Sequence, residues 1–320
     1  MNNVNEEIVL LGGGGGVYRV ARFLKHRRNN ITTIQTMFDH GGHSGKLRDE
    51  RGALPPGDIR QAILALADDE VEGALRTLLS YRFTHNGSSI DNATMGNLML
   101  TALTEHYGDP IAAIEAMCRI FRVRGKVLPV SIDHADLCVT LSDGSTICGE
   151  GKIDTRSTAD DRRIVSAHLS PTANIYVGAY EAIVRADKIV FCPGDLFTSV
   201  IPNTLVDGFA DAIEKTNAKL VYIVNLMTKH AETPRFTASR FARTVLSYIG
   251  RDRFHAVMAN NSDIQPDIRK RYRKERSYPV QVDIDRLQRV ADVVLTGDIA
   301  DQSGEVLRHN SNIATLICNL

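Results

Sequence analysis

The sequence predicts an α/β protein with a doubly wound, mostly parallel, Rossmann-like sheet and a small β insertion. Short apolar runs of strand length alternate with helical patterns along most of the chain, as in parallel sheets that helices cover on both faces. Five consecutive glycines follow the first apolar run, at a strand-to-helix turn. No linker, repeat or low-complexity tract interrupts the pattern, so we expect residues 1–320 to form a single domain with the insertion at about 126–150.

The first half of the chain supplies two strands and three helices to this prediction. The run Ile-Val-Leu-Leu at 8–11 predicts a buried strand, and the apolar spacing after the glycines predicts a helix over 17–28. A second strand is expected over 32–38. The sequence Pro-Pro-Gly-Asp predicts a helix start with Asp58 as N-cap, and residues 98–107 predict a helix that ends at Gly108.

The second half contains the insertion and the remaining strands. Apolar runs separated by a Ser-Asp-Gly turn predict a local antiparallel sheet between 126 and 149. Each later run lies beside a helical pattern, which returns the chain to the parallel sheet. These later strands are expected at 188–192, 220–224, 254–258 and 293–296.

Composition excludes several classes of protein. Lys and Arg balance Asp and Glu at 38 each, so net charge gives no reason to expect a nucleic-acid or membrane partner. The polar, acidic start is unlike a signal peptide, and no apolar run is long enough to span a bilayer. The five cysteines are scattered, without metal-site spacing, and predict reduced thiols in the cytoplasm.

The glycine turn predicts an anion site. It consists of Gly12, Gly13, Gly14, Gly15 and Gly16. A bare backbone lets another group approach, and a helix N-terminus offers free N–H groups to a phosphate. The turn lacks the sixth-position glycine of the dinucleotide fingerprint and the Gly-Lys-Ser/Thr of the P-loop. A flexible turn without a ligand is the alternative.

The end of the second strand carries further candidates. Asp39 suits a ribose contact, a divalent cation or a general base, and a turn aspartate is the plain alternative. His40 and His43 beside it suggest a transition-metal site, which we do not favour. The phosphate-binding candidates that follow, with ordinary loop residues as the alternative, are Ser44, Lys46 and Arg48.

Other strand and helix ends add polar groups. Thr198 and Ser199, at an expected helix start, suit a phosphate or sugar, although capping explains one of them equally well. Asn225 follows another strand, and Asn97 is either a cap or an amide that contacts a base. The basic run at 269–276 favours a solvated helix face, with a phosphate-binding arginine within it as the alternative.

These motifs, in this order, resemble the family of 2-phospho-L-lactate transferases (CofD) and the YvcK-like gluconeogenesis factors (UPF0052). Leu-Pro-Pro-Gly-Asp-Ile-Arg at 54–60 matches a family motif outright, and the glycine turn corresponds to its Gly-Gly-Thr-Gly loop. Further matches are Gly-Asn-Leu at 96–98, Asn-Leu-Met-Thr at 225–228 and Arg-His at 308–309. The resemblance covers nearly the whole chain.

Four departures alter the polar chemistry of the family pattern. His40 replaces the second acid of an Asp-Asp pair, and His43 replaces a serine. Ala93 stands where many relatives carry histidine, and Asp195 where they carry serine. A carboxylate at position 195 would repel a phosphate unless a cation or a capping role compensates it.

The resemblance implies a regulator that binds a nucleoside diphosphate, such as a uridine-diphosphate sugar. The alternative is a magnesium-dependent transferase of the phospholactate type, with Asp39 holding the metal or orienting the acceptor and His40 as base. A second alternative, an NAD-dependent dehydrogenase, is disfavoured by the glycine pattern, and we expect no NAD. The resemblance also implies a homodimer, with a protein partner if the molecule is a sensor.

Overall fold

The chain folds around a seven-stranded parallel sheet. The computed structural model describes residues 5–28, 30–38, 54–84 and 91–320, and only the backbone of residues 70–72 and 75. The strand order is β10-β9-β8-β7-β1-β2-β3, and every neighbouring pair is parallel. These strands are β1 (Ile8–Gly12), β2 (Ile31–Gln35), β3 (Lys126–Pro129), β7 (Lys188–Phe191), β8 (Lys219–Ile223), β9 (Phe254–Asn260) and β10 (Ala291–Gly297).

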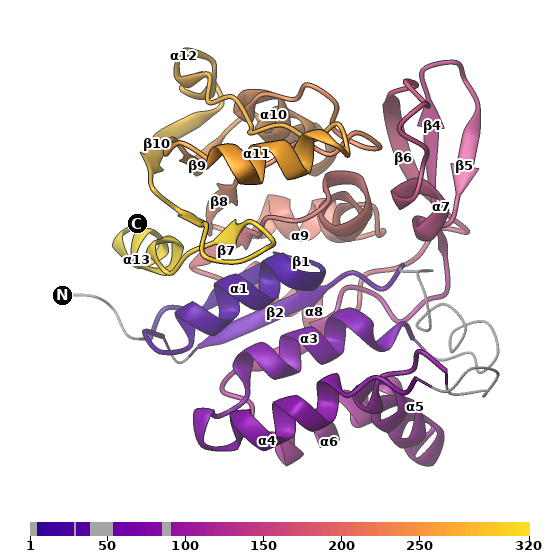
Figure 1. The fold of residues 1–320 in the computed structure, drawn as a ribbon. Helices are drawn as coiled ribbons and strands as arrows, with labels where there is room; N and C mark the ends of the chain where they lie inside the picture. The colour runs from indigo at the N-terminus through magenta and orange to yellow at the C-terminus, as the bar shows by residue number, and fades with distance from the viewer. Residues whose placement is uncertain (1–4, 29, 39–53, 85–90) are drawn as a thin grey trace.

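Helices cover both faces of this sheet (Figure 1). Alternate residues of β1 enter two different apolar cores, because successive side chains of a strand point to opposite faces. One core joins the sheet to α1 (Gly14–Leu24), α3 (Pro56–Leu66), α5 (Met95–Tyr107), α6 (Pro110–Ile120), α11 (Pro266–Arg273) and α13 (Asn312–Asn319). The other joins it to α8 (Val177–Arg185), α9 (Phe209–Lys215) and α10 (Ala238–Ile249). This is the predicted doubly wound fold.

The remaining elements are short or peripheral. They are α4 (Asp69–Ser80), α7 (Glu150–Asp154), α12 (Ile284–Leu287), the hairpin β11 (Ala300–Asp301) with β12 (Arg308–His309), a π-helical turn, η1 (Leu196–Val200), and a 3₁₀ turn, η2 (Ile201–Thr204). No helix in the described part of the chain is both long and apolar enough to cross a lipid bilayer.

The β insertion differs from the expected 126–150. β3 belongs to the main sheet as its edge strand, parallel to β2. The antiparallel sheet instead has the order β5-β4-β6, with β4 (Asp136–Leu141), β5 (Thr146–Cys148) and β6 (Ile164–Ser170). The sequence pattern did not assign β6 to this sheet, because a helix and a loop separate β6 in sequence from β5 and from its partner strand, β4.

Two of the expected free thiols are paired. Cys138 on β4 and Cys148 on β5 are direct partners in the antiparallel ladder, and a disulfide joins them. The expectation that all five cysteines are reduced is wrong for this pair, because the hairpin brings together two residues that spacing alone does not connect. Cys118, Cys192 and Cys318 are free.

Candidate functional site

The glycine turn lies between β1 and α1, where its lack of side chains permits close packing. A Cβ on Gly16 would lie 1.5 Å from the carbonyl oxygen of Pro193, which follows β7. Gly14 begins α1 with φ +57°, a conformation that favours glycine. A Cβ on Gly15, in contrast, would meet no atom within 4 Å of the described chain. Internal packing therefore explains Gly16, whereas the open side of the turn lies at Gly15.

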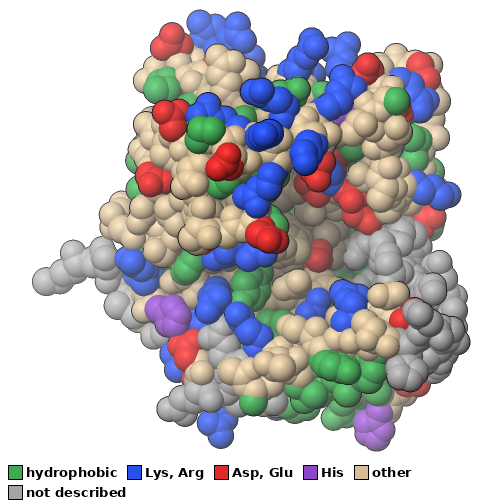
Figure 2. Space-filling model, in the orientation of Figure 1, with side chains coloured by type: hydrophobic (Ala, Val, Ile, Leu, Met, Phe, Trp, Pro, Cys, Tyr) green, Lys and Arg blue, Asp and Glu red, His purple; other side chains and the backbone are tan. Residues whose placement is uncertain are grey.

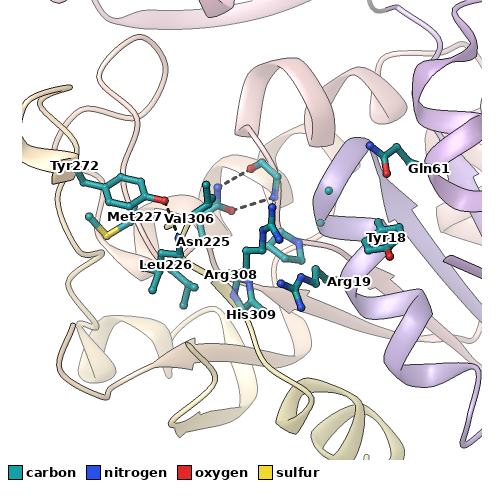
Figure 3. Close-up of a pocket in the computed structure, with 15 residues that line it drawn as sticks. Tyr18, Arg19, Gln61, Asn225, Leu226, Met227, Tyr272, Val306, Arg308 and His309 are labelled. Atoms are coloured by element: carbon teal, nitrogen blue, oxygen red, sulfur yellow. Dashed lines mark hydrogen bonds between the residues drawn. The ribbon is translucent and has the colours of Figure 1, made fainter. Parts of the chain in front are cut away.

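A cavity of about 490 Å³ opens beside this turn. The strand order reverses between β1 and β7, and ligands of doubly wound proteins bind at the carboxyl ends of strands at such a point. We call this space the switch-point cavity. Figure 3 shows its residues, which are Gly15, Gly16, Tyr18, Arg19, Gln61, Pro193, Gly194, Asn225, Leu226, Met227, Tyr272, Val306, Leu307, Arg308 and His309.

Two arginines give this cavity its positive charge. Arg19 from α1 and Arg308 from β12 lie near each other in Figure 3. Burial lowers the pKa of Arg19, and the positive charge of Arg308 lowers it further. Asp301 compensates in part, with its Oδ2 3.7 Å from Nη2 of Arg19. Two guanidiniums that share one carboxylate favour an added anion.

His309 forms the floor of the cavity as a neutral side chain. It is buried, and its Nε2 lies 3.1 Å from the carbonyl oxygen of Val224 at the end of β8. A carbonyl accepts hydrogen bonds, so Nε2 carries the proton and Nδ1 is left as an acceptor. Burial lowers the pKa of His309 to about 4, with a further contribution from Arg19.

Two asparagines hold the strand ends that frame the cavity. The amide of Asn225 pairs with the backbone of Gly194, donating from Nδ2 to the carbonyl at 2.6 Å and accepting at Oδ1 from the N–H at 3.4 Å. Asn203 was not singled out from the sequence. Its buried Nδ2 donates to the carbonyl of Gly12 at 3.3 Å and to that of Ser199 at 2.9 Å. Asn225 thus has a structural task besides lining the cavity.

Thr198 does not have the expected role at a helix start. Its hydroxyl donates to Oε1 of Glu232 at 3.0 Å, and Oε2 of the same carboxylate accepts the N–H of Phe197 at 2.7 Å. Glu232, which is fully buried, therefore caps the turn η1. Ser199 packs against the glycine turn, where a Cβ on Gly13 would lie 3.4 Å from its own Cβ. Of the predicted pair, only Ser199 lies beside the glycine turn.

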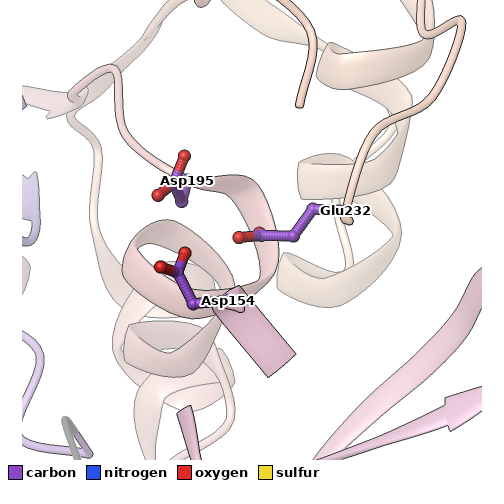
Figure 4. A group of neighbouring side chains, drawn as sticks. All are labelled: Asp154, Asp195 and Glu232. Atoms are coloured by element: carbon purple, nitrogen blue, oxygen red, sulfur yellow. The ribbon is translucent and has the colours of Figure 1, made fainter. Parts of the chain in front are cut away.

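The carboxylate of Asp195 belongs to a cluster of three acids around one lysine. Figure 4 shows Asp154, Asp195 and Glu232 pointing toward one another from three elements. Nζ of Lys229 lies 2.6 Å from Asp195 Oδ2 and 3.3 Å from Glu232 Oε1, and also contacts Asp154. Burial and the nearby charge of Glu232 raise the pKa of Asp195 to about 8, while the ammonium group of Lys229 beside it favours the charged form.

This cluster accounts for the carboxylate at position 195, where relatives carry serine. The ammonium group of Lys229 supplies the compensating cation that the sequence left open. Three carboxylates this close also suit a divalent ion, but Lys229 already contacts all three. The cluster as it stands does not fit magnesium.

Asn97 lies apart from the switch-point cavity. Thr94 is the N-cap of α5, and its hydroxyl accepts the N–H of Asn97 at 3.3 Å. The side-chain oxygen of Asn97 accepts from Nε of Arg60 at 3.0 Å, inside the protein. Asn97 is therefore neither the cap nor a lining residue of this cavity; it holds a buried arginine. Asp58, expected as an N-cap, lies inside the first turn of α3, because that helix starts at Pro56.

Several predicted residues lie outside the described part of the chain. They are Asp39, His40, His43, Ser44, Lys46 and Arg48. The structure adds Arg19, Tyr272 and Arg308, which the sequence did not assign to the site. The Arg-His motif at 308–309 and the tyrosine within the basic run were the signals for two of them. Arg19 lies one helical turn beyond the glycines, and no sequence pattern assigned it to the site.

Comparison with known proteins gives a consistent result. The family model described as 2-phospho-L-lactate transferase CofD matches residues 8–300. The gluconeogenesis factor of Bacillus subtilis is 34% identical over 98% of both chains, and a putative gluconeogenesis factor of Thermotoga maritima is 37% identical over 95% of this chain and 96% of its own. A crystal structure of a UPF0052 family member from Bacillus halodurans superposes with a TM-score of 0.91 at 34% identity, covering 98% of this chain and 99% of that one.

The family model covers all seven strands of the main sheet, from β1 to β10, and the relatives align along almost the full chain. The chain therefore belongs to the CofD family, and within it resembles the gluconeogenesis factors of the UPF0052 group.

Proposed function

We propose that the switch-point cavity binds a nucleoside diphosphate-linked molecule, such as a uridine-diphosphate sugar, and that the protein acts as a regulator through this binding. The observation that carries the proposal is the pair Arg19 and Arg308 beside the open backbone of Gly15. Two guanidiniums and the N-terminus of α1 supply the charge and the N–H donors that a diphosphate needs.

The far side of the cavity supplies the surface for a base or sugar. Tyr272 and Met227 line it opposite α1, and the Tyr272 hydroxyl accepts the N–H of Leu307 at 3.0 Å, which fixes the ring (Figure 3). An aromatic ring with a few directed polar groups suits a nucleoside. A volume of about 490 Å³ is within the range of small-ligand sites.

The alternative function is a magnesium-dependent transferase that releases a nucleoside monophosphate. Its metal ligand and base, Asp39 and His40, lie outside the described residues, so no described contact favours it. We propose that any magnesium accompanies the diphosphate and Asp39, because Lys229 already compensates the Asp154–Asp195–Glu232 cluster. For the NAD-dependent dehydrogenase alternative, the sixth position of the fingerprint is Val17, which is fully buried in α1.

Calorimetry with UDP-glucose, GDP, GTP and NAD tests the binding proposal. We expect a UDP-sugar to bind and Arg308→Ala to weaken that binding at least tenfold, because Arg308 lines the cavity and its guanidinium would pair with the diphosphate. Arg185→Ala is the matched control, since Arg185 lies exposed at the end of α8 and should leave affinity unchanged. Binding of NAD alone, or equal effects of both variants, would overturn the proposal.

A second measurement separates regulator from transferase. The protein is incubated with magnesium, nucleotide donors and candidate acceptors, and released monophosphate is measured. We expect none. Turnover that Asp39→Asn abolishes while nucleotide binding persists would establish the transferase instead.

A further inference from the structure

The structure contains a second, strongly basic cavity that the proposed function does not use. Its volume is about 500 Å³, and it shares no residue with the switch-point cavity. We call it the arginine cavity. Its charged and titratable lining residues are Asp161, Arg163, His230, Arg235, Arg240 and Arg276, with Pro234 and Tyr278 completing the wall.

Four separate segments bring these arginines together. Arg163 directly precedes β6, Arg235 lies in the loop between β8 and α10, Arg240 is in the first turn of α10, and Arg276 follows α11. The basic run that contains Arg276 was expected to be a solvated helix face. Most of its charged residues are exposed, as expected, while Tyr272 lines the switch-point cavity and Arg276 lines this one. Figure 2 shows Lys and Arg side chains gathered on the surface over α11.

Charge in this cavity is unbalanced. Asp161 is its single described carboxylate, and that group pairs with Arg276 at 2.8 Å (Oδ1 to Nη2). Within the described residues, no carboxylate lies within ion-pair distance of Arg163, Arg235 or Arg240. The chain as a whole carries equal numbers of acidic and basic residues, so this excess is local. Three uncompensated guanidiniums around one concavity repel one another, and a bound anion would relieve that repulsion.

Side-chain contacts hold two of these arginines, Arg240 and Arg276, in place. The guanidinium of Arg240 lies over the ring of Phe236, 4.1 Å from its centroid, and burial together with the charge of Arg163 lowers the pKa of Arg240. Arg276 also donates to the carbonyl of Thr158, and its Nη1 lies 3.4 Å from Nε2 of His230. Arg235 and Arg276 have φ of +59° and +54°, conformations that cost energy for residues with a Cβ. Two of the four arginines are thus held at some cost in backbone energy.

We propose that the arginine cavity binds a small anion that carries more than one phosphate group. Planar guanidiniums match phosphate oxygens in pairs, and three of them suit a ligand with at least two negative charges. A concave space of about 500 Å³ fits a phosphorylated small molecule better than a nucleic acid or an acidic protein segment, which would favour an extended surface. The proposal does not depend on the switch-point cavity, because the two sites share no residue.

Calorimetry with inorganic pyrophosphate on the full chain tests this. Because the switch-point cavity also attracts phosphate, the titration is made on Arg308→Ala protein, in low salt and without magnesium. We expect pyrophosphate to bind this protein, phosphate to bind more weakly, and the added pair Arg163→Ala/Arg240→Ala to weaken pyrophosphate at least tenfold. Arg240→Lys should give an intermediate loss, since it keeps the charge but not the planar group.

Arg243→Ala is the matched control. Arg243 is an exposed arginine on α10 that does not line the cavity, and its loss should leave pyrophosphate affinity unchanged. UDP-glucose binding to otherwise wild-type protein should survive Arg163→Ala/Arg240→Ala, which separates this proposal from the proposed function. Equal losses from Arg243→Ala, or no binding of pyrophosphate at millimolar concentration, would overturn the proposal. Binding of an oligonucleotide or acidic peptide in place of pyrophosphate would overturn it as well.

Discussion

Replacing neighbouring glycines of the turn by alanine should give opposite results. In Gly16→Ala the new Cβ would lie 1.5 Å from the Pro193 oxygen and 2.6 Å from its carbon, so two backbones must separate until the contact reaches at least about 3.4 Å. Such overpacking costs about 3 kcal/mol, at the upper end of the usual range, because neither atom is the end of a flexible side chain. For a chain of 320 residues, that corresponds to a fall in Tm of about 4–5 °C.

Gly15→Ala provides the internal comparison. Its Cβ meets no atom of the described chain within 4 Å, and alanine is favoured over glycine in a helix by about 0.5–1 kcal/mol. We expect Tm to be unchanged or raised, while UDP-sugar affinity falls on the order of tenfold because the methyl group occupies the approach to the α1 N-terminus. Differential scanning fluorimetry and calorimetry measure the two effects. A Gly16→Ala protein as stable as wild type would refute the packing argument, and unchanged affinity in Gly15→Ala would refute the placement of the diphosphate.

Three further predictions concern titration and thiols. Burial lowers the pKa of His309 from its usual 6.5 to about 4, so the stability of the wild type relative to a His309→Gln protein should fall by about 3 kcal/mol as pH drops from 6.5 to 4. Urea unfolding of both proteins across that range measures this difference. The pKa of Asp195 is raised to about 8, which favours the protonated form of this carboxyl in the folded state. The stability of the wild type relative to Asp195→Asn should therefore fall as pH rises from about 4 to about 8. Parallel pH profiles for the two proteins would contradict this prediction. Thiol titration of unreduced, denatured protein should find three free thiols, and a count of five would show that Cys138 and Cys148 are not joined. Cys148→Ser should lower the free energy of unfolding by about 2–3 kcal/mol, and only under oxidising conditions.

The sequence predicted the sheet well because its strands are short apolar runs with local signals at their ends. It failed where structure depends on which strands pair and in which register. β3 is an edge strand of the main sheet, and Cys138 meets Cys148 only through a hairpin register. The position of the cavity followed from the glycine turn, and Asn225 does line it.

The roles of individual polar residues were harder to predict. Thr198 and Asn97 have the expected polar groups near element ends, but each is paired with a buried charged partner, Glu232 or Arg60, that no local pattern indicates. Arg19 and Arg308 reach one site from positions almost three hundred residues apart. The predicted roles of Asp39, His40, Ser44, Lys46 and Arg48, the homodimer, the protein partner and the cytoplasmic location stay predictions.

The segment between β8 and α10 has a thermodynamic consequence, because it is a shared wall. Met227 lines the switch-point cavity, and three residues later His230 lines the arginine cavity. Between them, the backbone N–H of Thr228 donates to the carbonyl of Tyr278 at 2.8 Å, and Lys229 forms an ion pair with Asp195. If a ligand in one cavity displaces this segment, the free energy of binding in the other cavity changes as well. Linkage then requires reciprocity: whatever factor pyrophosphate imposes on the dissociation constant of the nucleotide, the nucleotide must impose on that of pyrophosphate.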